Sequence, residues 1–270
     1  MNRKLIILLL VVGTIVALTA ALASADSHLA MVSVGHGIPG TDLGQPEELP
    51  VDVIVDGGCF LQDFEFGEFA GPVGLPAGTY SVTVALSDGD PDACAGTGVI
   101  GPVELTFEAE DNVTIFAHLT ADGLPGPVAV DVLGLGITAT VFDNDVSDVV
   151  AGHTRLTVRH TAWAPEVDLL LNRGWVRGRV IGFFEGLANP QELGPVDVRP
   201  GAYAVTLFPA GEEEPVFQVP ATPEDDPFVT HPHRSQIVYA VGSLENETFS
   251  LMIQNFDLGH MPPHRPALPE

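Results

Sequence analysis

The stretch LPAGTYSVTV at residues 75–84 returns later in the chain as VRPGAYAVTL at residues 198–207. In both versions a proline and a glycine precede a tyrosine, after which apolar and polar residues alternate. Turn residues followed by period-two alternation are typical of a half-buried β-strand. A strand entry that occurs twice predicts a duplicated domain if its neighbours recur in the same order.

The neighbouring segments do recur in the same order. The matched segments, first copy against second, are 34–36 and 158–160, 50–58 and 166–174, 113–119 and 236–241, and 137–142 and 249–254. The second copy carries a longer crossover between Gly174 and Arg199, and loops of this kind are where two copies of one scaffold would differ in function. The predicted domains are a first repeat at 28–143, a linker at 144–152, a second repeat at 153–258, and a disordered Pro-rich tail at 259–270.

The fold class follows from the density of strands and turns. The chain contains 29 glycines and 23 prolines in 270 residues, and no window after residue 25 shows sustained helical periodicity. Many short strands separated by frequent turns favour a sandwich over helices. We therefore expect an all-β protein with two tandem antiparallel β-sandwich domains, immunoglobulin-like or transthyretin-like, after a signal peptide.

Residues 1–25 have the three parts of a signal peptide. Arg3 and Lys4 supply the basic start, residues 5–22 supply the apolar stretch, and Ala23-Ser24-Ala25 is a small-residue cleavage motif. The apolar stretch approaches membrane-spanning length, so an uncleaved N-terminal anchor is the alternative. The cleavage motif favours removal, which predicts a secreted, cell-surface or periplasmic protein with no membrane segment after cleavage.

The VGH, PVDVIVDGG and LPAGTY segments of the first copy resemble domain of unknown function 4397. This family occurs, often in tandem, in secreted or surface-associated bacterial proteins, and the resemblance covers most of residues 30–258. It is more specific in the first copy, because the second has Glu166, Arg199 and Ala202 where the pattern has other residues. The resemblance implies an extracytoplasmic β-sandwich and brings no catalytic residues with it.

Charge limits the classes of partner. The formal net charge is −26, and removal of Arg3 and Lys4 with the signal peptide would make it −28 and leave no lysine. Nucleic acid and anionic membranes would be repelled by such a protein. The acidity is compatible with simple solubility, with Ca²⁺ binding or with life in high salt, and screening by salt should raise the stability of the fold.

The two cysteines both lie in the first copy. An even pair in an exported protein predicts one disulfide, Cys59–Cys94. A catalytic thiol is the alternative, but no Cys–His pair occurs at an interpretable spacing. The second copy has no cysteine, so the bond would be a local staple and not part of the shared fold.

Histidine and aspartate recur at matched positions, His36 with Asp52 and His160 with Asp168. A His–Asp pair could act as a general base in an extracellular hydrolase. No nucleophile recurs beside either pair, and no Gly-x-Ser-x-Gly motif is present. We therefore interpret the four residues as structural, predict no catalytic residues, and expect the protein not to be an enzyme.

Two further groups are candidate binding residues. Asp88, Asp90 and Asp92 alternate along one loop and offer the hard oxygen ligands that Ca²⁺ prefers, although the loop lacks the remaining features of an EF-hand. Trp163 and Trp175 occur only in the second copy. They could stack on sugar rings if exposed, or fill the core if buried.

These observations predict an extracytoplasmic, non-catalytic β-domain protein with a structural, adhesive or binding role. Its partner would be an extracellular ligand or a surface polymer. The candidate cofactor is Ca²⁺, and the alternatives are a hydrolase built on the His–Asp pairs and a calcium- or carbohydrate-binding module. The sequence does not indicate the ligand or the oligomeric state.

Overall fold

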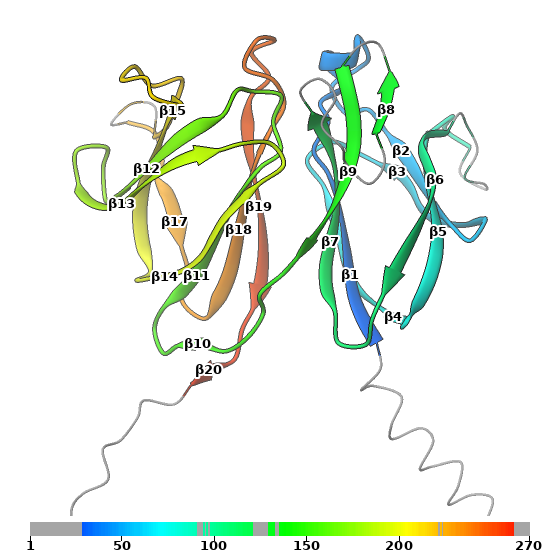
Figure 1. Ribbon diagram of the computed structural model, residues 1–270, viewed down its shortest axis with the longest axis horizontal. Helices are drawn as coiled ribbons and strands as arrows, with labels where there is room; N and C mark the ends of the chain where they lie inside the picture. Colours follow the sequence, from blue (N-terminus) through cyan, green and yellow to red (C-terminus); the bar gives the residue numbers. More distant parts are fainter. Residues whose placement is uncertain are drawn as a thin grey trace, which may run out of the picture.

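The structure is a computed structural model that describes residues 29–90, 94, 96, 98–120, 129–132, 135–220, 222 and 224–261. The described chain is all-β, as the sequence predicts, and its strands form two sandwiches that lie side by side (Figure 1). The predicted signal peptide and most of the predicted tail lie outside the described residues. Among the described residues, none of the helices has the length and apolar character needed to cross a bilayer.

The first sandwich consists of β1 to β9. Its two sheets have the strand orders β4-β1-β7-β9-β8 and β3-β2-β5-β6, and a short 3-10 helix, η2, follows β1. The bounds are β1 Leu29–His36, η2 Gly40–Leu43, β2 Val51–Val55, β3 Gly58–Phe64, β4 Phe69–Pro76, β5 Gly78–Leu86, β6 Gly98–Phe107, β7 Asn112–Thr120, β8 Ala129–Val132 and β9 Leu135–Asp143.

The second sandwich consists of β11 to β19. Its sheets have the orders β14-β11-β18-β19 and β13-β12-β15-β16, with β17 also paired to β15. The bounds are β11 Thr154–His160, β12 Val167–Arg173, β13 Arg179–Leu187, β14 Glu192–Val198, β15 Gly201–Pro209, β16 Phe217–Val219, β17 Phe228–Thr230, β18 Arg234–Val241 and β19 Ser250–Asp257. Two short strands, β10 Val149–Val150 and β20 His260–Met261, pair with each other beside it.

The two sandwiches share one topology. Within the sandwiches, neighbouring strands are antiparallel except for β1 with β7 and β11 with β18. These two pairs are parallel and hold His36 opposite Ala117 and His160 opposite Ala240. The pairing of β1 with β4 and that of β11 with β14 also contain a bulge at matched positions. The internal repeat read from the sequence is therefore also a repeat of strand order and register, while the predicted domain boundaries stay a prediction.

A glycine makes each of these bulges possible. Gly71 in β4 and Gly194 in β14 have φ angles of 97° and 111°, a region of backbone conformation that side chains disfavour. A Cβ at Gly71 would lie 2.7 Å from the carbonyl oxygen of Val32, and one at Gly194 would lie 2.8 Å from that of Leu156. Both copies therefore require glycine for the same close backbone approach.

Alternating apolar residues fill the space between the sheets of each sandwich. In the second sandwich the core takes alternate residues of β12 and β15, including Leu169, Leu171, Val205 and Leu207. Burying one such side chain contributes roughly 1.5–3 kcal/mol relative to leaving it exposed. The polar face of the alternation is turned away from this core, as period-two patterning requires.

A third apolar cluster joins the two sandwiches. Strands β7 and β9 of the first meet β18 and β19 of the second through Phe116, Phe142, Tyr239 and Met252. Strand β18 is buried on both faces, because alternate residues point into its own sandwich and into this interface. The two copies therefore pack against each other through a shared apolar core and are not independent domains joined only by a linker.

Candidate functional site

The two recurring histidines bond to the backbone near their own strands. His36 Nε2 lies 3.0 Å from the carbonyl oxygen of Leu49, and its Nδ1 accepts a hydrogen bond from the amide of Ile38. His160 Nε2 lies 3.0 Å from the carbonyl oxygen of Pro165. Burial lowers the pKa of His36 to about 4 and lowers that of His160 as well, because the charged imidazole loses its hydration.

The two recurring aspartates make a different contact. Asp52 Oδ1 accepts from the amide of Asp63 in β3, and Asp168 Oδ1 accepts from the amide of Gly186 in β13. Each carboxylate thus fixes the strand next to its own. In each copy the histidine and the aspartate bond to separate backbone groups. Among these four described residues, no hydrogen bond joins His36 to Asp52 or His160 to Asp168, so neither pair has the contact by which an aspartate orients a histidine general base.

A buried histidine that the sequence analysis did not single out lies near His160. His118 in β7 is fully buried, with Nδ1 2.7 Å from the carbonyl oxygen of Leu119 and Nε2 2.9 Å from Thr140 Oγ1. Desolvation, with a smaller contribution from the nearby His160, lowers its pKa to about 4 against the opposing effect of the hydrogen bond to the Leu119 carbonyl. The sequence signal that could have identified His118 is its position in the predicted late strand at residues 113–119, which is buried on both faces in the fold.

The predicted disulfide is present, and it links Cys59 in β3 to Cys94. In the acidic loop above it, Asp88 Oδ1 accepts from the amide of Asp90, while Asp92 lies outside the described residues. Within the described part of the chain, no three His, Cys, Asp or Glu side chains are grouped so as to hold a metal ion. The calcium site at Asp88, Asp90 and Asp92 stays a prediction.

The two tryptophans have different surroundings. Trp163 is half-buried and packs against an apolar cluster of the first sandwich that includes Ile38, Leu43 and Leu119. Trp175, in the loop between β12 and β13, is 51% exposed. Trp163 therefore belongs to the contact between the sandwiches, and Trp175 is the tryptophan that an external ligand could reach.

The arginines divide into a paired and an unpaired set. All Lys and Arg residues after Lys4 are arginines, and all of them lie after residue 154. Arg155 pairs with Asp145 and Asp197, Arg159 with Glu192, and Arg234 with Asp257. Four others, Arg173, Arg177, Arg179 and Arg199, are exposed, and in the described residues none of them lies within salt-bridge distance of a carboxylate.

These four arginines and Trp175 lie at one end of the second sandwich, and we call them the basic–aromatic end. Arg173 and Arg179 are cross-strand partners at the base of the β12–β13 hairpin. Arg173 Nη2 donates to the carbonyl oxygen of Pro200, which brings Arg199 to the same end. Figure 1 shows that this hairpin loop lies at the outer end of the second sandwich, away from the first.

The loop that carries Trp175 and Arg177 is held by its own hydrogen bonds. The amide of Gly178 donates to the carbonyl oxygen of Trp175 at 2.6 Å, and Asn172 Nδ2 donates to the carbonyl oxygen of Val176. Below the loop, the buried Tyr203 donates its hydroxyl to the carbonyl oxygen of Arg199. The exposed groups therefore sit on an ordered support, which reduces the entropy that a ligand would have to offset.

The equivalent end of the first sandwich has no arginine and no tryptophan. Its β2–β3 connection is the tight turn Asp56-Gly57, and Pro76 stands where the second copy has Arg199. The support is nevertheless the same, because Tyr80 donates to the carbonyl oxygen of Pro76 as Tyr203 does to that of Arg199. The basic–aromatic end is thus an elaboration of one copy on a shared scaffold.

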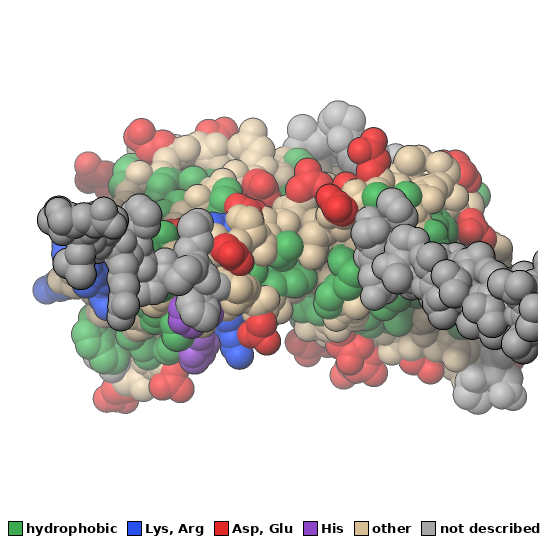
Figure 2. Space-filling view, turned by 90° about the horizontal axis from the view of Figure 1, so that it is seen from below, with side chains coloured by type: hydrophobic (Ala, Val, Ile, Leu, Met, Phe, Trp, Pro, Cys, Tyr) green, Lys and Arg blue, Asp and Glu red, His purple; other side chains and the backbone are tan. Residues whose placement is uncertain are grey.

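Figure 2 shows the resulting charge distribution on one face of the molecule. Blue Lys and Arg side chains occur only in the half formed by the second sandwich, some of them at its outer end, whereas red carboxylates are spread over both halves. Residues 5–154 contain no Lys or Arg at all. The molecule is therefore strongly acidic with one unpaired cationic end.

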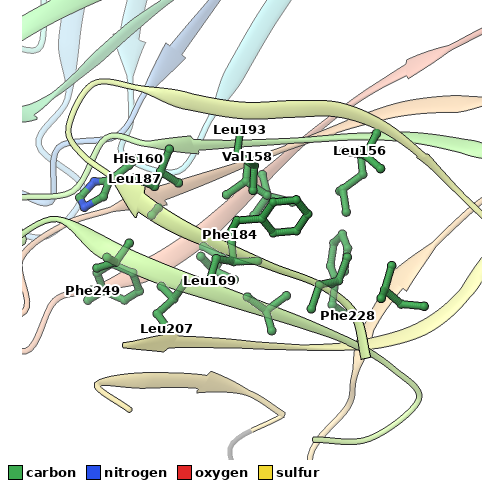
Figure 3. A pocket seen from close by; sticks show the side chains of 18 residues that line it. Leu156, Val158, His160, Leu169, Phe184, Leu187, Leu193, Leu207, Phe228 and Phe249 are labelled. Atoms are coloured by element: carbon green, nitrogen blue, oxygen red, sulfur yellow. The ribbon is translucent and has the colours of Figure 1, made fainter. Parts of the chain in front are cut away.

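Each sandwich also encloses a small apolar cavity between its sheets. The cavity of the second sandwich has a volume of about 70 Å³, and Leu169, Phe184, Leu193 and Phe249 point into it, with His160 at its border (Figure 3). The first sandwich has two such cavities, one of about 70 Å³ lined by residues such as Val53 and Phe107 and one of about 80 Å³ with His36 at its border. These cavities lie within the cores and carry almost no polar groups that would orient a substrate.

The fold and the site define a class of protein: tandem β-sandwiches, the first of them stapled by a disulfide, in which the recurring histidines His36 and His160 are buried and polar and aromatic groups lie on loops. Residues 30–170, just over half of the chain, match the family described as Domain of unknown function (DUF4397). The chain belongs to this family. No curated protein matches the chain.

Proposed function

We propose that this protein is an exported, non-catalytic binding protein that attaches to an extracellular polymer through the basic–aromatic end. The observation that carries the proposal is the half-exposed Trp175 beside four unpaired exposed arginines on a surface that is otherwise acidic. Exposed side chains of these two types are the ones that most often anchor a bound partner. The disulfide and the family membership support export.

The remaining candidate groups support a scaffold role. His36, His160, Asp52 and Asp168 are buried and satisfy backbone groups, so they maintain the sandwiches that present the loops. The cluster at the interface fixes one sandwich on the other. A rigid pair of sandwiches of this kind suits a surface or matrix module that presents a binding loop at one end.

Affinity electrophoresis tests the proposal. The purified protein and its Trp175→Ala variant are run through gels that each contain one neutral or acidic polysaccharide, with Ile253→Ala as a control because Ile253 is an exposed apolar residue of β19. We expect at least one polymer to retard the protein and the control but not the Trp175 variant. The proposal is wrong if no polymer retards the protein, or if Trp175→Ala is retarded equally.

A further inference from the structure

The basic–aromatic end combines two chemistries that one class of ligand would satisfy together. A guanidinium group binds a carboxylate through two parallel hydrogen bonds, and it does so best when no protein carboxylate competes. Arg173, Arg177, Arg179 and Arg199 meet that condition in the described residues. The exposed indole of Trp175 offers a flat apolar face beside them.

We propose that the basic–aromatic end recognises acidic polysaccharide, with its arginines on the uronate carboxylates and Trp175 against a sugar ring. This inference rests on the proposed function and names the ligand class of the same site. Its basis is the spacing of the groups along the end: Arg173 and Arg179 face each other across two strands, Trp175 and Arg177 lie in the loop beyond them, and Arg199 enters from the turn before β15.

The position of the end explains how an acidic protein could hold an acidic ligand. The net charge of −26 repels polyanions at long range. Repulsion is weakest where the carboxylates are fewest, and the hairpin loop lies on the side of the second sandwich that faces away from the first (Figure 1). A narrow polymer chain can contact this outer end without covering the first sandwich, where residues 5–154 have no basic side chain.

A second copy of the protein is the competing partner, because the first sandwich supplies the opposite charge. Association of two copies, however, would bring together two molecules that each carry a large negative charge. An exposed tryptophan in an ordered loop is compatible with either partner. One hairpin offers a small contact area, which is less than a stable dimer interface needs. A polymer can compensate for a small contact because it repeats the same binding group along its length.

The test compares three polymers that separate charge from sugar. Polygalacturonate carries both, carboxyl-reduced polygalacturonate keeps the sugar chain without the carboxylates, and polyphosphate carries negative charge without sugar. Binding of each polymer to the full protein is measured by biolayer interferometry over a series of salt concentrations. We expect polygalacturonate to bind at least tenfold more tightly than either control polymer, with an affinity that falls as salt increases.

Matched variants locate the binding. Arg177→Gln and Arg179→Gln should each weaken polygalacturonate binding about tenfold, and Trp175→Ala should do the same. Arg234→Gln should leave it unchanged, because the guanidinium group of Arg234 is exposed but already paired with Asp257. Circular dichroism checks that each variant is folded.

Each contrary result overturns the inference in a distinguishable way. Equal binding of the carboxyl-reduced polymer, lost in Trp175→Ala, would retain the proposed function and reject acidic specificity. Equal binding of polyphosphate would reject sugar recognition. Concentration-dependent self-association in sedimentation velocity that Arg177→Gln abolishes would assign the end to a second copy. No binding of any of the three polymers rejects the acidic ligand, while the neutral gels still test the proposed function separately.

Discussion

The ring of Phe116 in the first sandwich stacks on the ring of Tyr239 in the second, with centroids 4.1 Å apart and planes inclined by 19°. Phe69 and Phe142 contact the same tyrosine ring, and Thr114 and Tyr239 both donate hydroxyl hydrogen bonds to Gln254 Oε1. The contact between the two copies therefore has an aromatic centre and a satisfied polar layer. It resembles a domain core more than a contact between loosely linked domains.

Phe116→Ala should destabilise the whole protein and not only the first sandwich. Removing a fully buried phenylalanine costs about 3–5 kcal/mol, and this ring contributes to the cluster shared by both copies. Urea unfolding is followed by the fluorescence of Trp175 in a Trp163→Phe background, because Trp163 packs against the first sandwich and Trp175 lies in the second. We expect its transition to shift to lower urea in the variant. An unchanged fluorescence transition, with Val73→Ala as the exposed control, would mean that the copies unfold independently.

Arg159 should be the most sensitive charged residue. Its guanidinium group is buried, donates to Tyr239 Oη, Asn144 Oδ1 and the carbonyl oxygen of Asp143, and pairs with Glu192. Arg159→Met removes the donor from Tyr239 Oη and from the carbonyl oxygen of Asp143 in a buried site and should lower the free energy of unfolding by about 3 kcal/mol.

Arg234→Met is the control for Arg159, because Arg234 pairs with a carboxylate that is largely exposed. Exposed pairs contribute about 0–1 kcal/mol. Both variants are measured by urea unfolding at one ionic strength. Similar losses for the two would show that the buried network contributes no more than a surface ion pair.

Stability should fall as the pH is lowered from about 6.5 to about 4. The fold holds His36 and His118 neutral, with pKa values of about 4 against the ordinary histidine pKa of 6.5, so the unfolded chain takes up protons first as pH falls. The stabilisation is therefore complete above pH 6.5 and is lost on approaching pH 4, by on the order of 3 kcal/mol per histidine.

The variant His118→Gln isolates one of these contributions. It removes one proton-binding group, so the free energy of unfolding should depend less steeply on pH between 6.5 and 4 in the variant than in the parent protein. Chemical denaturation at several pH values measures both curves. Parallel curves would refute a pKa of about 4 for His118, whatever the absolute stability of the variant.

The sequence was sufficient to predict the sandwiches because the local signals agree with the fold. The alternation after Tyr80 and Tyr203, the turns after β2 and β12 and the repeated order of segments all reflect backbone requirements that a single chain makes visible. The parallel pairing of β1 with β7 and of β11 with β18 was not predicted, because strand partners distant in sequence leave no local pattern.

The interface and the candidate site were predictable to different degrees. The longer crossover after Gly174 coincides with the longer loop between β12 and β13, and Trp175 in that loop is a residue the sequence singles out. The clustering of Arg173 with Arg199 depends on the folded sheet, in which β12 and β15 are neighbours. Burial of Arg159 could not be read from an arginine on a strand, because its four partners come from three separate segments of the chain.

Sodium chloride should raise the melting temperature, because the protein carries a net charge of −26 and its carboxylates repel one another. Melting is measured in NaCl, in CaCl₂ at the same ionic strength and in chelator. Equal shifts in the two salts would mean that screening accounts for the effect.

The same experiment tests the predicted calcium site. A larger shift in CaCl₂ that Asp88→Asn and Asp90→Asn remove would establish the site, because a ligand that binds only the folded state raises its stability. Glu212→Gln and Glu213→Gln are the matched control, since they remove the same charge from another exposed loop. If they abolish the extra shift as well, Ca²⁺ acts through the overall charge and not through a site.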